Sequence, residues 1–534
     1  MGWRWVLIGW LALVLPLCGA TSVQAAGSRL DTIRAHGVLV VGVKSEYPPF
    51  GEVDANGKIV GMEPDMAADL ARRLHVDLRL VGVTTANRLQ KLQDGTVDVL
   101  IATLGDTPKR REIVNIVSPD YYASGVNIMM PADKKPAAWR DLQGQTVCTT
   151  QGAYFNRPMS QRYLFNLQVY NTNRDAMLAL HERRCLGWLY DDTAIAVALN
   201  EPEWQGFAMP LPSLLLSPWG IAIRQGDDGA DLERVISDTI VDWHRSGFLI
   251  DLEKKWKLQP SKYLKDAHEL WSKKDASGDY VCKRQANGEW PASCLDEVGA
   301  NAENMSALEK LGAKIADETG LDFSVVYDGY DRGQYLYGLL VSLALIFACV
   351  MGSVTVAGLC AMLMDARTPV IGRLVRVLTT FARMTPPLLQ LYIVVFGISS
   401  FTVHWGFTMN AFAATVVCLS LYAGSASAVA LIEAADTIRH KEPEFHIALR
   451  RLPSVFNVAY QPVMASLVNI VKATGMASAV AVPELISKST AIIAERGNSG
   501  VMMNVLMVTY FLLVVGVMTL IDHLHRRMVG HAAA

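Results

Sequence analysis

The stretch VLVVGVKSEYPPF, residues 38–50, introduces the pattern that decides the fold of the first half of the chain. A short run of β-branched residues ends in a loop with two prolines, and the amphipathic segment PDMAADLARRL follows. The order of strand and helix returns in DLRLVGV, ANRLQKLQDG and VDVLIATL, and once more in TVCTT, RDAMLALHERR and CLGWLY. Such alternation is typical of an α/β domain with buried strands. Its repetition predicts two lobes within residues 27–258, the second covering about 129–218.

The second half of the chain has a different composition. The 534 residues are too many for one core, and the formal net charge of −2 gives no sign of a nucleic-acid partner. Residues 334–534 contain several uncharged stretches of about 20 residues or more, each long enough to cross a bilayer as a helix. We therefore expect an all-α membrane domain of about five spans, centred on 336–364, 384–403, 407–432, 459–482 and 501–521.

Basic residues orient these spans. Arginines and lysines cluster after the first, third and fifth spans, whereas the loop after the second has none and the loop after the fourth has only Lys488 and Arg496. By the positive-inside rule, the C-terminus is cytoplasmic and the α/β domain is exported. The pattern predicts a multi-pass membrane protein whose N-terminal domain lies outside the cytoplasm.

The N-terminus has the layout of a secretory signal. Arg4 precedes an apolar stretch and the small residues SVQAAG, so we expect a signal peptide at 1–26 with cleavage near Ala25 or Ala26. A retained anchor helix and a lipid on Cys18 are the alternatives.

Cysteine placement agrees with export. Two plausible disulfide pairs lie outside the spans, formed by Cys148, Cys185, Cys282 and Cys294. Residues 259–333 are predicted to be a periplasmic linker with a small disulfide-bonded subdomain and an amphipathic helix within 301–320. The scattered cysteines do not have the spacing of zinc ligands.

Two loops at strand ends carry candidate binding groups. YPPF, residues 47–50, sets an aromatic ring beside a rigid pair of prolines, and IATLGDTPKR, residues 101–110, supplies Thr103, Gly105 and Arg110. Free backbone amides and a guanidinium together make a clamp for a carboxylate. The alternatives are a packed loop at Tyr47 and a surface role for Arg110.

These segments, followed in order by GQTVCTTQGAYFN, CLGWLYDD and WGIAIRQGDD, resemble the periplasmic amino-acid-binding proteins that serve ABC importers. The resemblance implies two lobes that close around a free amino acid by a hinge motion. By position, it implies that Tyr47 stacks on the side chain of the ligand and Arg110 grips its α-carboxylate. Thr103 and Gly105 would bond the ligand from the first lobe. Asp191 would hold the α-ammonium, or else act only as a helix N-cap.

The second-lobe loop departs from the family pattern. It begins at Gly152, and Ala153 and Tyr154 stand where the family usually has small hydroxyl residues. Lys44 bears on selectivity, because binders of cationic amino acids resemble one another in carrying an acidic residue at that place. Lys44 would favour an acidic or amide side chain, unless it points to solvent. Some family members also have a disulfide at the location of Cys148 and Cys185.

The membrane half resembles a histidine/glutamine-type ABC permease subunit in FARMTPPLLQLYIVVFG, AATVVCLSLYAGSASAVALIEAA and AYQPVMASLVNIVKATGMASAVAVPELIS. Lys472, an ionisable residue within an apolar span, is a candidate for the translocation path. The alternative is a lysine at a helix break that reaches water.

The stretch HKEPEFHIALRRLPSVFNVAYQP, residues 440–462, falls in a predicted cytoplasmic loop. Permeases of this kind have a short helix there that seats in a groove of the ATPase subunit. Ile447 and Leu449 keep apolar positions of that helix, and an amphipathic helix resting on lipid is the alternative. The resemblance places the contact with the ATPase on Glu444, Phe445, His446 and Arg450, the last three replacing small residues of the family.

The chain has no G-x-x-x-x-G-K-[ST] sequence, so ATP and Mg²⁺ are expected on a separate ATPase subunit. We expect no cofactor or metal bound by this chain and no enzyme activity. The leading interpretation is a fused receptor and permease, working as a homodimer, that imports a polar amino acid. A ligand-gated channel and a membrane amino-acid sensor are the alternatives.

Overall fold

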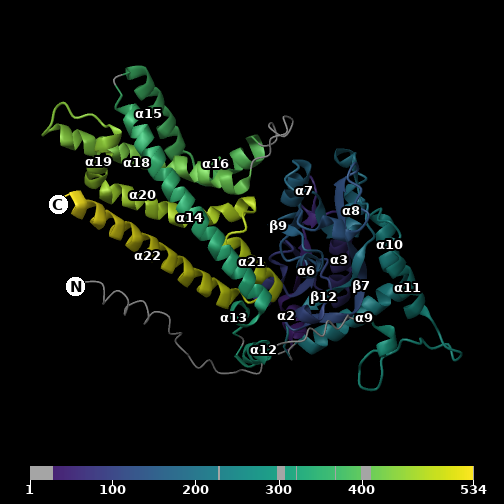
Figure 1. Ribbon diagram of the computed structural model, residues 1–534. Coiled ribbons are helices and arrows are strands. Elements are labelled where there is room, and N and C mark those ends of the chain that lie inside the picture. Colours follow the sequence, from purple (N-terminus) through teal and green to yellow (C-terminus); the bar gives the residue numbers. More distant parts are fainter. Residues whose placement is uncertain are drawn as a thin grey trace.

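The computed structural model describes residues 28–226, 229–296, 307–319, 321–366, 368–398 and 410–532. The predicted signal peptide therefore lies outside the described residues. An α/β domain stands beside a bundle of long helices, and both predicted halves of the chain are confirmed (Figure 1).

One sheet runs through both lobes of the α/β domain. Its strand order is β5-β1-β6-β12-β7-β10-β8-β9. Strands within each lobe are parallel, whereas the long strands β7 and β12 are antiparallel to each other and cross between the lobes. These two strands connect the lobes, which is where a hinge motion would act. The bounds are β1 (Val38–Lys44), β5 (Asp77–Val83), β6 (Val99–Ile101), β7 (Asn115–Pro131), β8 (Thr146–Thr150), β9 (Asn166–Tyr170), β10 (Trp188–Asp191) and β12 (Leu214–Ile223). A further strand, β11 (Phe207–Ala208), pairs with β7, and β2 (Glu46–Tyr47), β3 (Gly51–Val53) and β4 (Ile59–Val60) form a small separate sheet.

Helices cover this sheet through apolar stripes. On α3 (Met62–Leu74) the stripe is Met62, Met66 and Leu70, spaced four residues apart and fully buried against the sheet. Truncating one such side chain to alanine costs about 2–5 kcal/mol. The other helices of the domain are α2 (Arg29–His36), α4 (Arg88–Gln93), α5 (Pro108–Arg111), α6 (Asn156–Tyr163), α7 (Asn173–His181), α8 (Asp192–Ala198), α9 (Ala230–Ser246) and α10 (Phe248–Lys255).

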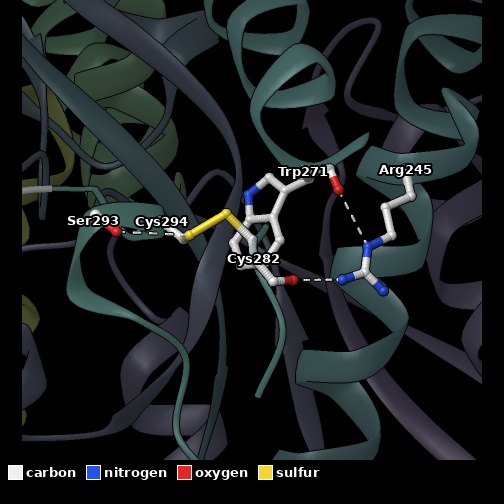
Figure 2. The surroundings of a disulfide bond; sticks show 5 residues. All are labelled: Arg245, Trp271, Cys282, Ser293 and Cys294. Atoms are coloured by element: carbon white, nitrogen blue, oxygen red, sulfur yellow. Dashed lines mark hydrogen bonds between the residues drawn. A yellow bond between two sulfur atoms is a disulfide. The ribbon is translucent and has the colours of Figure 1, made fainter. Parts of the chain in front are cut away.

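The predicted linker is largely attached to the α/β domain. Helix α11 (Lys262–Ser272) packs against α9, and Trp271 is buried with the Cys282–Cys294 disulfide (Figure 2). Arg245 of α9 donates hydrogen bonds to the carbonyls of Trp271 and Cys282, at 3.3 and 2.6 Å. The other predicted disulfide, between Cys148 and Cys185, is also present. Short helices α12 (Ala307–Thr319) and α13 (Ser324–Tyr327) lead to the bundle.

The helical half differs from the expectation at its second span. Four helices in the described ranges are long and apolar enough to cross a membrane: α14 (Gly329–Met364), α18 (Ala411–Arg439), α20 with η8 (Tyr460–Val480), and α22 (Ser499–Ala532). The predicted span 384–403 is instead part of a pair, α15 (Pro369–Met384) and α16 with η5 (Pro387–Ile398), bent by 102°. Pro386 and Pro387 explain the bend, because proline removes a helical hydrogen bond and disfavours helix in the residue before it. The bent pair brings the number of spans to five if it counts as one.

The expected helix within 440–462 is present only in part, because the helical residues begin at Leu449 and leave out Glu444, Phe445 and His446. Helix α18 ends at Arg439, and the next α-helix, α19 (Leu452–Val458), begins next to Pro453. The turns and irregular residues that follow α18 bury Phe445 and Ile447 against α14 and α18. Pro443 explains the break because it cannot supply the backbone donor that would continue α18.

Candidate functional site

The two lobes touch across the cleft where parallel strands end. Tyr47, just after β1, donates a hydrogen bond from its hydroxyl to Oδ2 of Asp191, at the end of β10, over 3.1 Å. The hydroxyls of Thr85 and Tyr190 lie 3.3 Å apart and join the lobes again. Loops at the carboxyl ends of parallel strands are the usual place for a ligand site in α/β folds. The residues predicted from the two lobes are therefore brought together.

Asp191 is a buried carboxylate that can accept a further hydrogen bond. It occupies the N-cap position of α8, but its side chain does not cap the helix. Among the described residues, its Oδ1 has no hydrogen-bond partner. Burial raises the pKa of Asp191 to about 7, although the hydrogen bond from Tyr47 acts in the opposite direction. A bound ammonium group would satisfy both the free oxygen and the charge.

Arg110 connects the lobes directly. The hydroxyl of Thr107 caps the short helix α5 that carries it. Its guanidinium donates to the carbonyl of Gly105 in the first lobe at 2.8 Å, and to the carbonyl of Gly152 in the second at 3.0 Å. Burial lowers the pKa of Arg110 to about 9, which leaves it cationic at neutral pH. The predicted clamp residues Gly105, Arg110 and Gly152 thus form one contact group.

Glycine is required at both ends of this clamp. A Cβ on Gly105 would lie 2.8 Å from Oγ of Ser217, and a Cβ on Gly152 would lie 2.6 Å from the carbonyl oxygen of Thr85. Gly152 also has φ +76°, which favours glycine. Tyr154 fills the second-lobe loop, with its ring centroid 5.8 Å from the guanidinium carbon of Arg110.

Lys44 points into the cleft, and the solvent alternative is therefore wrong. Its side chain is buried and its Nζ donates to Oγ1 of Thr85. The same Nζ lies 5.6 Å from the ring centroid of Tyr47. Burial, followed by repulsion from Arg88, lowers the pKa of Lys44 to about 7.

Two charged residues of the cleft were missed at the level of sequence. Glu63, in the first turn of α3, accepts hydrogen bonds from the backbone amide of Thr103 at 2.6 Å and from the hydroxyl of Tyr121 at 2.5 Å. Arg88 donates to the carbonyls of Ala102 and Thr103, at 2.6 and 2.8 Å. Together they hold Thr103, whose φ is +45°, in place. An acidic residue in the first turn of a helix is common. The only feature of the sequence that indicated burial of Glu63 was its position after a loop of the cleft.

The predicted residues of the helical half lie away from the cleft. Lys472 is exposed on the surface of α20. Glu444, His446 and Arg450 are also exposed, whereas Phe445 is buried inside the bundle. Within the described ranges, no cluster of side chains could hold a metal ion.

A two-lobed α/β domain on a double-stranded hinge, with buried charges facing one another across the cleft, defines a solute-binding domain. Residues 39–259 match the family model of bacterial extracellular solute-binding proteins, family 3. The N-terminal part of the chain is therefore a family 3 solute-binding domain.

Relatives of this domain include binders of different amino acids. The chain is 25% identical over 256 residues to the L-cystine-binding protein TcyJ of Escherichia coli, covering 47% of this chain and 95% of that protein. It is 23% identical over 252 residues to the glutamate/aspartate import solute-binding protein of Salmonella typhimurium, covering 44% and 82%. Among solved structures, a mutant of ArgBP from T. maritima is 29% identical, with TM-score 0.40, covering 43% of this chain and 98% of that one.

Proposed function

We propose that this protein is the combined solute-binding and permease subunit of an ABC importer for a polar amino acid, driven by a separate ATPase subunit. The observation that carries the proposal is the direct packing of the mouth of the cleft against the apolar helices. Helix α21 (Leu485–Arg496), between α20 and α22, lies where the bundle meets the binding domain (Figure 1). A Cβ on Gly152 of the cleft would be 3.2 Å from Cβ of Ala494 on α21.

Ion pairs join both lobes to the bundle. Lys109 of the first lobe pairs with Glu495 of α21, and Arg157 of the second lobe pairs with Asp328 at the start of α14. Arg496 bonds to the same Asp328 and to Asp331. Ala481, which follows η8, packs into the hydrophobic core of the binding domain. Such an arrangement supports a binding domain that delivers its solute to its own spans.

A cavity of about 830 Å³ lies between the second lobe and the bundle. Its lining includes Gly152 and Arg157 of the binding domain and residues of α14, α18 and α21. Ligand pockets have volumes of roughly 300–1,000 Å³, so this space is large enough for an amino acid. A cavity whose wall includes both Gly152 of the cleft and residues of the apolar helices supports a permease over a sensor, which needs no space for the solute there.

The buried charges of the cleft favour an acidic solute. Arg110 and Asp191 match the α-carboxylate and the α-ammonium of any amino acid. The remaining buried charges are Lys44, Arg88 and Glu63. The charges of Lys44, Arg88 and Glu63 sum to one positive charge. Transfer of a proton from Lys44 to Glu63 does not change that sum. An acidic side chain balances that charge, whereas a basic one would leave two positive charges buried, which is costly.

The membrane arrangement follows from the same proposal. Large exposed apolar side chains are frequent on α14, α15 and α22, where lipid or a second copy of the chain would cover them. We propose a homodimer in the bacterial inner membrane, with the binding domain periplasmic and the C-terminus cytoplasmic. The exposed groups Glu444, His446 and Arg450 would face the ATPase, and Lys472 the translocation path.

Reconstitution of the full chain with a candidate ATPase in proteoliposomes tests this function. An importer requires ATP-dependent uptake of an acidic or amide amino acid, with ATP hydrolysis stimulated by that solute. Ion current without ATP would favour the ligand-gated channel, and solute binding with neither activity would favour the sensor. Calorimetric titration of the full chain against amino acids tests the solute class, and tight binding of arginine or lysine alone would refute the acidic preference.

A further inference from the structure

The cavity between the binding domain and the bundle begins beside the cleft. Gly152, whose carbonyl accepts the hydrogen bond from Arg110, contributes to its lining, and so do Tyr337 of α14 and Lys488 of α21. Gly152 thus belongs both to the contact group of Arg110 and to the wall of a space that reaches the helices of the bundle. This space is called the chamber below.

Lys488 is held in the wall of the chamber by close packing on α14. A Cβ on Gly338 would lie 3.0 Å from Cγ of Lys488, so the glycine makes room for the lysine stem. The Nζ of Lys488 lies 5.6 Å from the ring centroid of Tyr337, a weak contact for a cation. Burial alone lowers the pKa of Lys488 to about 8, because no carboxylate among the described residues acts on it.

The other charged side chains that line the chamber are already engaged. Glu495 pairs with Lys109, Arg157 with Asp328, Asp331 with Arg496, and Arg184 with Glu182. Lys488 is the exception in the part of the chain that the structure describes, since no carboxylate lies within ion-pair distance of it there. Lys488 is partly buried, and a cation that has lost part of its hydration without gaining a counter-charge is stabilised by an anion.

We propose that the chamber is a second solute site, in which Lys488 binds a carboxylate of the amino acid after it leaves Arg110. The proposal rests on the proposed import function and adds a binding step between the cleft and the spans. The site takes a carboxylate-bearing solute of amino-acid size. An acidic amino acid presents two carboxylates and is held more firmly than its amide.

Protection of Lys488 from a small amine-acylating reagent tests the site without an ATPase. The full chain in detergent is labelled at pH 7.5 with increasing L-glutamate, and peptides are quantified by mass spectrometry. The low pKa makes Lys488 reactive at that pH, and exposed Lys254 serves as the internal control. We expect protection of threefold or more at Lys488 and none at Lys254.

The variant Asp191→Asn separates the chamber from the cleft. If the chamber is a site, L-glutamate still protects Lys488 in this variant, at a concentration set by the chamber alone. Protection of Lys488 in the wild type but not in Asp191→Asn would show that Lys488 only responds to closure of the cleft, which would overturn the site. Absence of protection in both proteins would also overturn it. A wild-type chain that binds no amino acid by calorimetry would instead refute the proposed function.

Uptake in proteoliposomes provides the second measurement. We expect Lys488→Met to lower glutamate uptake at least fivefold and Lys488→Arg, which keeps the charge, to restore most of it. Equal uptake by Lys488→Met and the wild type would overturn the site. Failure of the wild type to transport at all would count against the import function rather than the chamber.

Discussion

Lys109 of the first lobe and Glu495 of α21 form an ion pair, with Nζ and Oε1 separated by 2.8 Å. The guanidinium of Arg157, in the second lobe, lies 3.9 Å from the same Oε1. One carboxylate of the membrane half thus contacts a cation from each lobe. Although burial opposes ionisation, Lys109 and Arg157 hold the pKa of Glu495 below its ordinary value. Opening of the cleft would separate the two cations, so Glu495 favours the closed lobes.

Substitution Glu495→Gln should therefore weaken amino-acid binding by the full chain, although Glu495 lies outside the cleft. Ion pairs at partly exposed positions are worth about 0.5–1 kcal/mol, which corresponds to a loss of roughly two- to fivefold in affinity. Calorimetric titration measures the loss. The matched control is Asp266→Asn, which removes the exposed pair with Lys262 on α11 and should leave affinity unchanged. Wild-type affinity in Glu495→Gln would show that docking does not depend on lobe closure.

Replacement of either charge at the centre of the cleft should abolish binding in the cleft and leave only the weaker site of the chamber. Asp191→Asn or Arg110→Ala leaves a buried charge of the amino acid without its partner, which costs about 3 kcal/mol or more, at least a hundredfold in affinity. Asp251→Asn, at a side chain that is 74% exposed, is the control. Unchanged affinity in either cleft variant would refute the role assigned to that residue.

The preference for glutamate over glutamine should fall as the pH rises from about 7 to 9. Burial lowers the pKa of Lys44 to about 7, so Lys44 loses its proton over this range in the free protein and must regain it to bind an anion. The ratio of the two affinities isolates this effect, because the α-groups that face Asp191 are common to both solutes. The ratio can change by up to about tenfold per pH unit.

The control for this pH dependence is Lys44→Met, which should flatten most of the change in the ratio. Glu63, whose pKa burial raises to about 7, ionises over the same range and also disfavours an anion, so a small dependence should persist. A wild-type ratio that is constant with pH would show that Lys44 does not face the side chain of the solute.

Loss of the Cys282–Cys294 disulfide should lower stability without changing affinity. The cysteines are separated by 12 residues, and closure of a loop of this size contributes about 3 kcal/mol. The double variant Cys282→Ser with Cys294→Ser should melt at a lower temperature in a ligand-free scan, whereas calorimetric affinity should match the wild type. Weaker binding would show that the α11 subdomain also supports the hinge.

Much of the cleft could be predicted from the sequence, because parallel strands end at one edge of a sheet. Tyr47 follows β1 and Asp191 is the last residue of β10, and their hydroxyl and carboxylate meet across the lobes. Glu63 and Arg88 escaped prediction for a physical reason. Both begin helices, where a charged residue is ordinarily solvated, and only tertiary packing buries them under the Thr103 loop.

The helical half was predicted less well, because hydropathy reports how apolar a segment is and not the direction in which its helix runs. The segment after Met384 is apolar enough for a span, but Pro386 and Pro387 turn it by 102°. The resemblance placed Phe445 at the contact with an ATPase, yet the chain leaves the helical path near Pro443 and Phe445 packs inside the bundle. In both places, the prolines were the feature of the sequence that indicated a break in the helix.

The covalent connection through α11, α12 and α13 makes docking of the binding domain an intramolecular event. Tethering of this kind sets an effective concentration near the millimolar range, at which contacts too weak to capture a free receptor suffice. The ion pairs at α21 are few and partly exposed, so they are weak contacts of this kind. If the proposed import function holds, the spans of each chain are served by the binding domain of the same chain, and an excess of unattached binding domains should compete poorly for the site.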